Sequence, residues 1–372
     1  METSTDRVLK AINHIQPDTT PVHIMGFESV ERWLESMQAK HDFDLRDKLG
    51  LDLRAAGAIY RGPNAERGLT VWGTEQDAGG YEGAGYSGVR SYPLAGATSV
   101  ADIERFTWPD PNDFDYEIAA EVLRTVPERA RCVRAAYALQ GGLAREETTR
   151  GAGLRSSVRD SGWLPIACTL FELFGLEEAL IMLHTEPKMT EAAVAQIEAF
   201  VLEYARRLFE ATQGEAELFW FGDDFSTQRS IMMSPEHWRR FFKPTYKKVF
   251  ELAKGYGLKV WFHSCGTFRP VLPDLIDIGM DVWETVQVHL PGNEPHTLKR
   301  EFGQDIAFYG AINTQQTLPF GTPEDVRAEV RERIRVLGKG GGYICGSDHG
   351  ILPDVPVANV LAMVDEAKAF SP

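Results

Sequence analysis

One histidine and two cysteines have the side chains and the spacing to bind a single metal ion. His263 and Cys265 lie two residues apart at the end of the strand-forming run 258–262, and Cys345 follows a second such run, 342–344. An imidazole with two thiols is a soft nitrogen–sulfur set that suits Zn²⁺. Three protein ligands would leave a fourth position for a substrate, as in catalytic zinc sites. The sequence therefore predicts a zinc ion bound by His263, Cys265 and Cys345.

These residues also have structural interpretations. A lone histidine after a strand is more often a hydrogen-bonded core residue, and it is the neighbouring Cys265 that favours a ligand role for His263. The remaining cysteines, Cys132 and Cys168, are interpreted as small buried hydrophobic residues. Bound zinc could hold a thiol as a thiolate or activate water for hydrolysis, and the motif alone does not separate these two reactions.

Further acids and an imidazole follow the ends of other predicted strands. In a (β/α)₈ barrel, the groups that act on the substrate collect where strands end and the following loops begin. The pair at 223–224 could equally cap a helix or orient a ligating imidazole. We expect five residues to contact the substrate or support the metal: Glu28, Asp223, Asp224, Asp348 and His349.

The alternation of strand-like and helical segments predicts the fold. The strand-like runs are 22–25, 132–137, 216–221, 258–262, 280–284, 306–309 and 342–345. Helices begin after the cap-and-proline pairs at 234–235 and 322–323, and a first helix is expected over 5–15. Alternating β and α units indicate a parallel sheet, and this number of strands favours a (β/α)₈ barrel over an open sheet. We predict one domain over residues 1–372.

Two segments depart from this alternation. Residues 62–100 are rich in glycine and tyrosine, which predicts a loop or hairpin excursion near the amino terminus. Residues 143–161 are polar, rich in arginine and without periodicity, which is typical of an inserted loop. That loop is either a surface loop or a lid over the barrel mouth.

Composition excludes several classes of protein. The net charge of −15 and the absence of a basic run argue against a nucleic-acid partner. Four cysteines in so long a chain do not form a disulfide framework and indicate a reducing compartment. The amino terminus lacks an apolar signal core, and the most apolar stretch, 163–183, carries three glutamates. We therefore expect a soluble cytoplasmic protein without a membrane span.

Several motifs in the carboxyl-terminal part of the chain resemble a known family. They are Gly222-Asp223-Asp224, His263-Ser264-Cys265-Gly266, residues 273–281, residues 309–313 and residues 353–360. Together they resemble the uroporphyrinogen decarboxylase superfamily, and within it the zinc-dependent, cobalamin-linked methyltransferases. The resemblance is strong from about residue 210 onward and looser before it; the segment 143–161 has no counterpart.

This resemblance implies both a fold and a reaction. It implies a (β/α)₈ barrel that binds zinc through His263, Cys265 and Cys345. The enzymes of this branch move a methyl group between a methylated corrinoid protein and a thiol such as coenzyme M, or another acceptor. The resemblance thus implies cobalamin, a corrinoid protein as partner, and a homodimer, which is common among the family's decarboxylases.

Two departures from the family pattern keep other functions open. The decarboxylase proper has an arginine-rich motif after the first strand, whereas residues 23–28 contain no arginine to pair with propionate groups. Residues 346–350 are more polar than expected for the thiol methyltransferases. A demethylating system that acts on a methoxylated or methylamine compound, with tetrahydrofolate or a thiol as acceptor, is therefore equally open. A metal-independent decarboxylase or lyase is the alternative. A non-catalytic corrinoid- or tetrapyrrole-binding protein is a further one, although the titratable groups at the strand ends argue against it.

Overall fold

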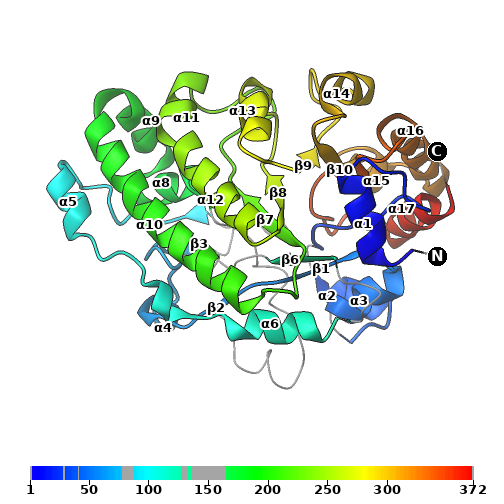
Figure 1. The fold of residues 1–372 in the computed structure, drawn as a ribbon, viewed down its shortest axis with the longest axis horizontal. Helices are drawn as coiled ribbons and strands as arrows, with labels where there is room; N and C mark the ends of the chain where they lie inside the picture. Colours follow the sequence, from blue (N-terminus) through cyan, green and yellow to red (C-terminus); the bar gives the residue numbers. More distant parts are fainter. Residues whose placement is uncertain are drawn as a thin grey trace.

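A parallel sheet of seven strands forms the centre of the protein (Figure 1). The computed structural model describes residues 2–27, 30–40, 42–77, 88–126, 132–135 and 165–370. In spatial order the strands are β1 (Leu53–Ala56), β6 (Cys132–Ala135), β7 (Leu218–Gly222), β8 (Lys259–His263), β9 (Val282–Val286), β10 (Ala307–Ile312) and β11 (Tyr343–Ser347). Each strand pairs in parallel with the next in this order, as expected for βα units.

The segment 21–24 lies between the two edges of this sheet and occupies the place of an eighth strand. The His23 backbone N–H donates to the Cys345 carbonyl at 2.9 Å, and the Cys345 N–H donates to the Pro21 carbonyl at 2.8 Å. On the other side, the Asp52 N–H donates to the Val22 carbonyl at 2.8 Å, just before β1 begins. The chain therefore has the predicted (β/α)₈ barrel architecture, with the strand expected over 22–25 reduced to an extended segment.

Helices cover the outside of the sheet. The main ones are α1 (Ser4–Ile12), α2 (Val30–Ser36), α3 (Asp42–Leu49), α6 (Glu117–Arg124), α8 (Ala167–Phe174), α9 (Leu176–Thr185), α10 (Pro187–Ala211), α11 (Pro235–Phe241), α12 (Lys243–Gly255), α13 (Leu272–Asp277), α14 (Pro295–Phe302), α15 (Thr317–Phe320), α16 (Pro323–Leu337) and α17 (Val357–Ala369). The predicted helix starts are confirmed, because Ser234 caps α11 and Thr322 forms a capping box with Asp325 at the start of α16.

Where the structure describes it, the predicted excursion at 62–100 and its flanks contain short elements. These are β2 (Ile59–Tyr60), α4 (Pro63–Glu66), β3 (Gln76–Asp77), β4 (Gly88–Val89), α5 (Val100–Arg105) and β5 (Phe114–Asp115). The strands form two antiparallel pairs, β2 with β5 and β3 with β4. The expected insertion at 143–161 lies outside the described residues. Strand β1 has no counterpart among the predicted strands, because Leu-Arg-Ala-Ala is poor in strand-forming residues.

Two apolar layers follow from the alternation of side chains along each strand. Residues that point inward form a compact cluster, which includes Trp220 of β7, Trp261 of β8, Tyr309 of β10 and Ile344 of β11. Residues that point outward belong to a larger cluster between the sheet and the helices. A side chain therefore reaches the barrel interior only from every second position of a strand.

The observed strands extend farther toward their carboxyl ends than the sequence pattern predicts. Strand β8 includes His263, which the sequence places after the strand. Strand β11 continues to Ser347, so Cys345 is its central residue rather than the residue that ends it. This shift determines which side chains can reach the barrel mouth.

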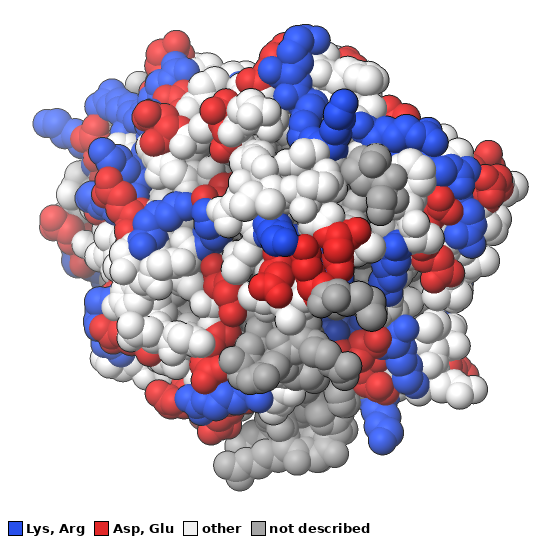
Figure 2. All heavy atoms as spheres, turned by 45° about the vertical axis from the view of Figure 1, so that its right-hand side comes forward, with Lys and Arg blue, Asp and Glu red and all other residues white. Residues whose placement is uncertain are grey.

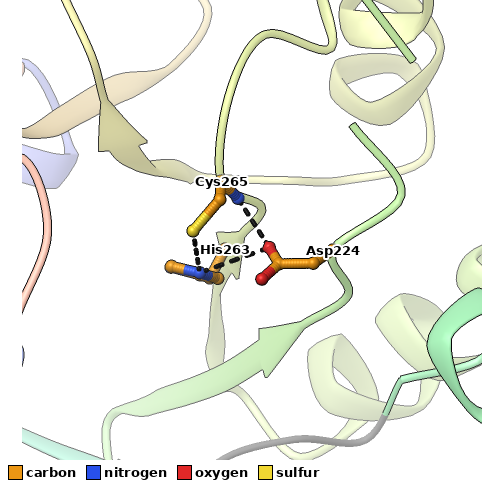
Figure 3. Close-up of side chains that lie close together, drawn as sticks. All are labelled: Asp224, His263 and Cys265. Atoms are coloured by element: carbon orange, nitrogen blue, oxygen red, sulfur yellow. Dashed lines mark hydrogen bonds and ion pairs between the residues drawn. The ribbon is translucent and has the colours of Figure 1, made fainter. Parts of the chain in front are cut away.

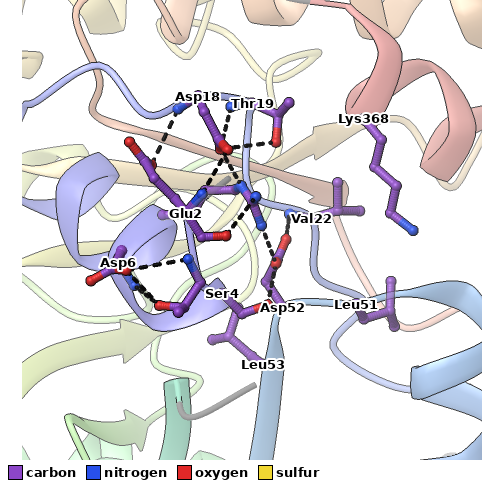
Figure 4. Close-up of polar contacts among 12 residues, drawn as sticks. Glu2, Ser4, Asp6, Asp18, Thr19, Val22, Leu51, Asp52, Leu53 and Lys368 are labelled. Atoms are coloured by element: carbon purple, nitrogen blue, oxygen red, sulfur yellow. Dashed lines mark hydrogen bonds and ion pairs between the residues drawn. The ribbon is translucent and has the colours of Figure 1, made fainter. Parts of the chain in front are cut away.

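A buried carboxylate ties the amino-terminal helix to the closure of the barrel (Figure 4). Asp52 is 5% exposed and accepts hydrogen bonds from the Val22 N–H at 2.8 Å and the Ser4 hydroxyl at 2.7 Å. The Arg7 guanidinium lies 3.0 Å from the same carboxylate and also pairs with Asp18 at 2.8 Å. This network fixes α1 over the end of the barrel at which the segment 21–24 enters the sheet.

The surface has the mixed charge expected from the composition. On the face drawn in Figure 2, basic and acidic side chains are interspersed, and a compact acidic group lies near its centre. No continuous basic area crosses the part of this face that the structure describes. Among the described helices, none has the length and the apolar character needed to cross a bilayer.

We predict that replacing Asp52 by alanine destabilises the barrel. The Asp52→Ala variant should lose about 2–4 kcal/mol in free energy of unfolding, because the Val22 N–H and the Arg7 charge lose a buried acceptor. Asp18→Ala, which removes the more exposed partner of Arg7, serves as the control and should cost less than about 1 kcal/mol. Urea unfolding followed by circular dichroism measures both. Equal effects of the two substitutions would contradict the role given to Asp52.

Candidate metal centre

Three potential metal ligands converge at the ends of β7 and β8 (Figure 3). They are the carboxylate of Asp224, the imidazole of His263 and the thiol of Cys265. His263 Nε2 lies 3.5 Å from Cys265 Sγ and 3.6 Å from Asp224 Oδ1. One ligand atom from each residue lies within 4.8 Å of the others, which defines the only such group of three among the described residues.

These separations fit the coordination shell of a zinc ion. Ligand atoms at about 2.0–2.3 Å from a tetrahedral zinc lie about 3.3–3.8 Å from one another. The separations of His263 Nε2 from Cys265 Sγ and from Asp224 Oδ1 fall inside this interval. Carboxylate oxygen, imidazole nitrogen and thiolate sulfur are all zinc ligands, and three of them leave one position for a further molecule.

The carboxylate of Glu284 orients the His263 ring. Its Oε1 lies 3.3 Å from His263 Nδ1, while its Oε2 accepts a hydrogen bond from the indole N–H of Trp261. Glu284 is fully buried and His263 is 2% exposed. A proton on Nδ1 that faces Glu284 leaves the lone pair of Nε2 directed toward Asp224 and Cys265. This is the carboxylate–histidine arrangement that commonly supports a metal ligand.

The loop after β8 is fixed by hydrogen bonds to both neighbouring strands. The Ser264 N–H donates to the Glu284 carbonyl at 2.9 Å, and the Cys265 N–H donates to Asp224 Oδ1 at 2.6 Å. The Gly266 N–H donates to Gln287 Oε1 at 2.9 Å. Cys265 is thus held in place by backbone contacts before any ligand binds.

Gly266 is required by the path of this loop. Its φ of +83° lies in the left-handed region, and a Cβ atom there would stand 2.3 Å from the Thr227 carbonyl oxygen. No L-residue fits without moving the backbone of residue 227, and that movement would displace the adjacent Cys265. The glycine in the motif His263-Ser264-Cys265-Gly266 therefore has a steric explanation.

The charges around Cys265 favour a bound cation. Burial raises the pKa of its thiol well above the ordinary range, and the carboxylate of Asp224 raises it further. Glu284 and Asp348 act in the same direction. A thiolate would therefore be unfavourable beside these acids unless a cation offsets the negative charge. The ligand atoms and their surroundings thus fit a divalent metal ion.

Cys345 does not belong to this group. Ile344 points into the barrel, so Cys345 points outward and joins the cluster between sheet and helices. Burial raises the pKa of its thiol to about 12, and the charges that act on it, Glu329 and Arg333, lie on α16. The prediction that Cys345 is the third ligand is wrong, because β11 continues past it. The carboxylate of Asp224 is the third candidate ligand in its place.

Asp223 serves the structural role that the sequence left open. Its carboxylate accepts hydrogen bonds from the N–H groups of Ile166, Ala167 and Cys168 at 2.7–2.9 Å, and from the Tyr246 hydroxyl. These N–H groups lie at the start of α8, so Asp223 caps this helix and ties it to the end of β7. The expectation of a catalytic or metal-supporting role for Asp223 is therefore replaced by helix capping.

The predicted residues after β11 lie near the metal centre. Burial lowers the pKa of His349, and the nearby imidazole of His263 lowers it further, which indicates that the two rings lie close together. Asp348 is fully buried, and its Oδ1 accepts hydrogen bonds from the backbone N–H and the hydroxyl of Thr314. Glu28 lies outside the described residues.

One further histidine belongs to this region and was not among the predicted residues. His289, in the turn after β9, faces Asp348 with its Nδ1 atom 3.4 Å from Oδ2. It lies five residues beyond the predicted strand 280–284, and only the observed strand β9, which ends at Val286, brings it into the turn directly after a strand. Its pairing with Asp348 joins loops from two different strands and follows only from the fold.

Comparisons with known proteins relate the chain to one superfamily. A family model described as "Uroporphyrinogen decarboxylase (URO-D)" matches residues 166–370. The chain is 26% identical over 201 residues to a uroporphyrinogen decarboxylase of Chlorobium luteolum, covering 51% of this chain and 52% of the relative. It is 27% identical over 219 residues to a methylated-thiol–coenzyme M methyltransferase of Methanosarcina mazei, covering 56% and 54%.

A solved structure extends the likeness of the fold to the whole chain. A methyltransferase from Methanosarcina mazei superimposes with a TM-score of 0.66 at 19% identity, covering 100% of this chain and 99% of the other. At that identity the likeness concerns the fold. In sequence, the chain spans about half the length of the curated relatives it matches.

We predict that Gly266→Ala lowers the affinity for Zn²⁺ by about 10–100-fold, the range seen when the support of a ligand is lost. The matched control is Gly257→Ala, which has a similar φ of +79° but no atom within 4 Å of the added Cβ. Both substitutions strain the backbone, and only the first displaces Cys265. Competition with a zinc-binding dye measures the affinities. Equal affinities in the two variants would contradict the steric role of Gly266.

Proposed function

Because the chain belongs to the uroporphyrinogen decarboxylase family, we propose that it is a zinc-dependent methyltransferase. It would move a methyl group between a corrinoid protein and a thiol or another nucleophilic acceptor. The observation that carries this proposal is the group formed by Asp224, His263 and Cys265 at the barrel mouth. The similarity to the methylated-thiol–coenzyme M methyltransferase supports this reaction class.

In this proposal the metal ion is bound by Asp224, His263 and Cys265, and the acceptor takes the fourth position. When bound, zinc would stabilise the anionic, nucleophilic form of the acceptor near neutral pH. The protein supplies the orientation: Glu284 fixes the ring of His263, and the backbone contacts of residues 264–266 fix Cys265. A preorganised ligand group of this kind loses little free energy to rearrangement when the acceptor binds.

The remaining polar residues would contact the acceptor or hold the surrounding elements in place. Asp348 and His349 follow β11 and lie next to the metal ligands, where they would contact the acceptor. Asp223 would act indirectly, because it holds the start of α8 against the end of β7. The methyl group would be exchanged with a corrinoid protein that docks over the carboxyl ends of the strands, where all of these groups lie.

The alternative is a decarboxylase that works without metal, since relatives with that name match at similar identity. A porphyrinogen carries several carboxylates that need cationic partners. The segment after the first strand, residues 23–28, contains no arginine. The nearby Arg46 is 2% exposed and donates to the Ile24 carbonyl, so it serves the fold. These observations favour the methyltransferase.

We predict that Cys265→Ala and Cys345→Ala affect zinc binding differently. The wild-type protein should contain about one zinc per chain, as expected for a single site. Cys265→Ala should lose this zinc, because a ligand is removed. Cys345→Ala should keep it, because that thiol faces α16. Elemental analysis of the wild type and the two variants, purified in parallel, measures their zinc content. Loss of zinc in both variants would restore Cys345 as a ligand, and zinc in neither protein would reject the site.

The reaction itself can be tested with free methylcobalamin as donor and 2-mercaptoethanol as acceptor. We expect the zinc-loaded protein to consume methylcobalamin, which is followed by its absorption spectrum, and to form the methyl thioether. Treatment with a chelator should abolish the reaction, and added Zn²⁺ should restore it. Release of carbon dioxide from uroporphyrinogen by the chelated protein, without methyl transfer by the loaded one, would favour the decarboxylase instead.

A further inference from the structure

We propose that Trp261 is a positioning residue of the metal centre, which sets the affinity for zinc by holding the carboxylate of Glu284 against the ring of His263. This inference rests on the proposed function, because it concerns the same metal site. A carboxylate that contacts a single ligand residue can still rotate. The residue that stops this rotation lies inside the barrel and is not itself a ligand.

The pairing of β8 with β9 places the three side chains together. Trp261 and His263 are two residues apart on β8, so both point to the same face of the sheet. Trp261 belongs to the inner cluster, and His263 therefore also points into the barrel. Glu284 is the register partner of His263 on β9. Its side chain can thus contact both residues of the neighbouring strand.

Each oxygen of the Glu284 carboxylate has its own partner. Oε1 lies 3.3 Å from His263 Nδ1, and Oε2 accepts the hydrogen bond from the Trp261 indole N–H. Glu284 is fully buried, so solvent does not compete for either oxygen. An indole N–H can only donate. It therefore keeps Oε2 as an acceptor on its own side and leaves Oε1 directed toward the imidazole.

Trp261 is itself held by the segment that closes the barrel. Its ring meets that of His23 edge-on, with centroids 6.1 Å apart and planes at 84°, and its centroid lies 5.2 Å from that of Tyr309. Trp261 and Tyr309 are fully buried, and His23 is 2% exposed. Aromatic rings packed in this way have little freedom to turn. The indole N–H thus has a fixed direction before any metal binds, because the closing segment 21–24 supports the ring.

Loss of the indole N–H would leave a buried carboxylate oxygen without its donor. Such an oxygen is costly in a low-dielectric interior, so the carboxylate would turn toward another partner. Rotation of Glu284 moves Oε1 away from His263, and the imidazole then adopts orientations in which Nε2 does not face Asp224 and Cys265. The affinity for zinc falls in proportion to the population of the productive orientation.

Replacement of Trp261 by phenylalanine keeps an aromatic ring in the barrel interior and removes the N–H. We expect Trp261→Phe to lower the affinity for Zn²⁺ by about 10-fold, the lower end of the range for residues that support a ligand. The control is Trp283→Phe, which changes a fully buried tryptophan of the outer cluster whose indole N–H donates to no described residue. This control should keep the wild-type affinity. Competition with a zinc-binding dye measures both, and urea unfolding measures the cost of each substitution to the fold.

A double-mutant cycle separates positioning through Glu284 from a general structural role. An amide has one acceptor oxygen, so in Glu284→Gln this oxygen serves either Trp261 or His263. We expect Glu284→Gln to lower the affinity for zinc by about 10–100-fold. Adding Trp261→Phe to this variant should cost less than about twofold more, because the amide oxygen is then free to turn to His263. Two independent effects would multiply instead.

Equal zinc affinities in Trp261→Phe and Trp283→Phe would overturn the proposal, as would effects that multiply in the double variant. If Trp261→Phe does not fold, incorporation of benzothienylalanine at position 261 removes the N–H at nearly constant size and must give the same loss of affinity. A wild type that binds no zinc would reject the proposal together with the metal site. Zinc binding with the expected affinities, but without methyl transfer from methylcobalamin, would reject the methyltransferase and leave the role of Trp261 intact.

Discussion

Closure of the parallel sheet by the segment 21–24 is the constraint on which the rest of the structure depends. This segment exchanges backbone hydrogen bonds with Cys345 of β11 on one side and with Asp52, just before β1, on the other. Only a closed ring brings the residues after β11 across the mouth toward those after β7 and β8. The closeness of His349 to His263 is therefore a consequence of closure, and the buried Asp52 anchors it.

At the mouth of the closed barrel, buried acidic side chains determine the chemistry of the candidate metal centre. Four acidic or potentially anionic side chains, Asp224, Cys265, Glu284 and Asp348, share a small region at the strand ends. Two of them have defined structural partners, because Glu284 holds His263 and Trp261 while Asp348 is held by Thr314. Keeping such groups together in a low-dielectric site is costly without a cation. The arrangement is therefore that of a metal-binding site, in which the cation offsets the negative charge of these groups.

This chain belongs to the URO-D family and resembles relatives that are named for two different reactions. A shared fold does not decide between the reactions, because activity depends on the side chains at the mouth. Here the decisive contrast is chemical: three metal-binding side chains converge, whereas the segment after the first strand offers no arginine to bind a polycarboxylate. The proposal of a zinc-dependent methyltransferase rather than a decarboxylase rests on that contrast.

The sequence by itself determined the architecture and the centre of the site. Alternating strand and helix patterns indicate the barrel, and the motif at 263–266 contains two of the three residues in the candidate metal-binding group. The tertiary structure decided the third. Strand β11 extends two residues beyond Cys345, and because successive side chains point to opposite faces, this thiol turns toward α16. Asp223 and Asp224 are adjacent, yet one caps α8 and the other faces His263, a division that pattern alone cannot make. The pairing of His289 with Asp348 likewise joins two loops that only the closed ring of strands brings into contact.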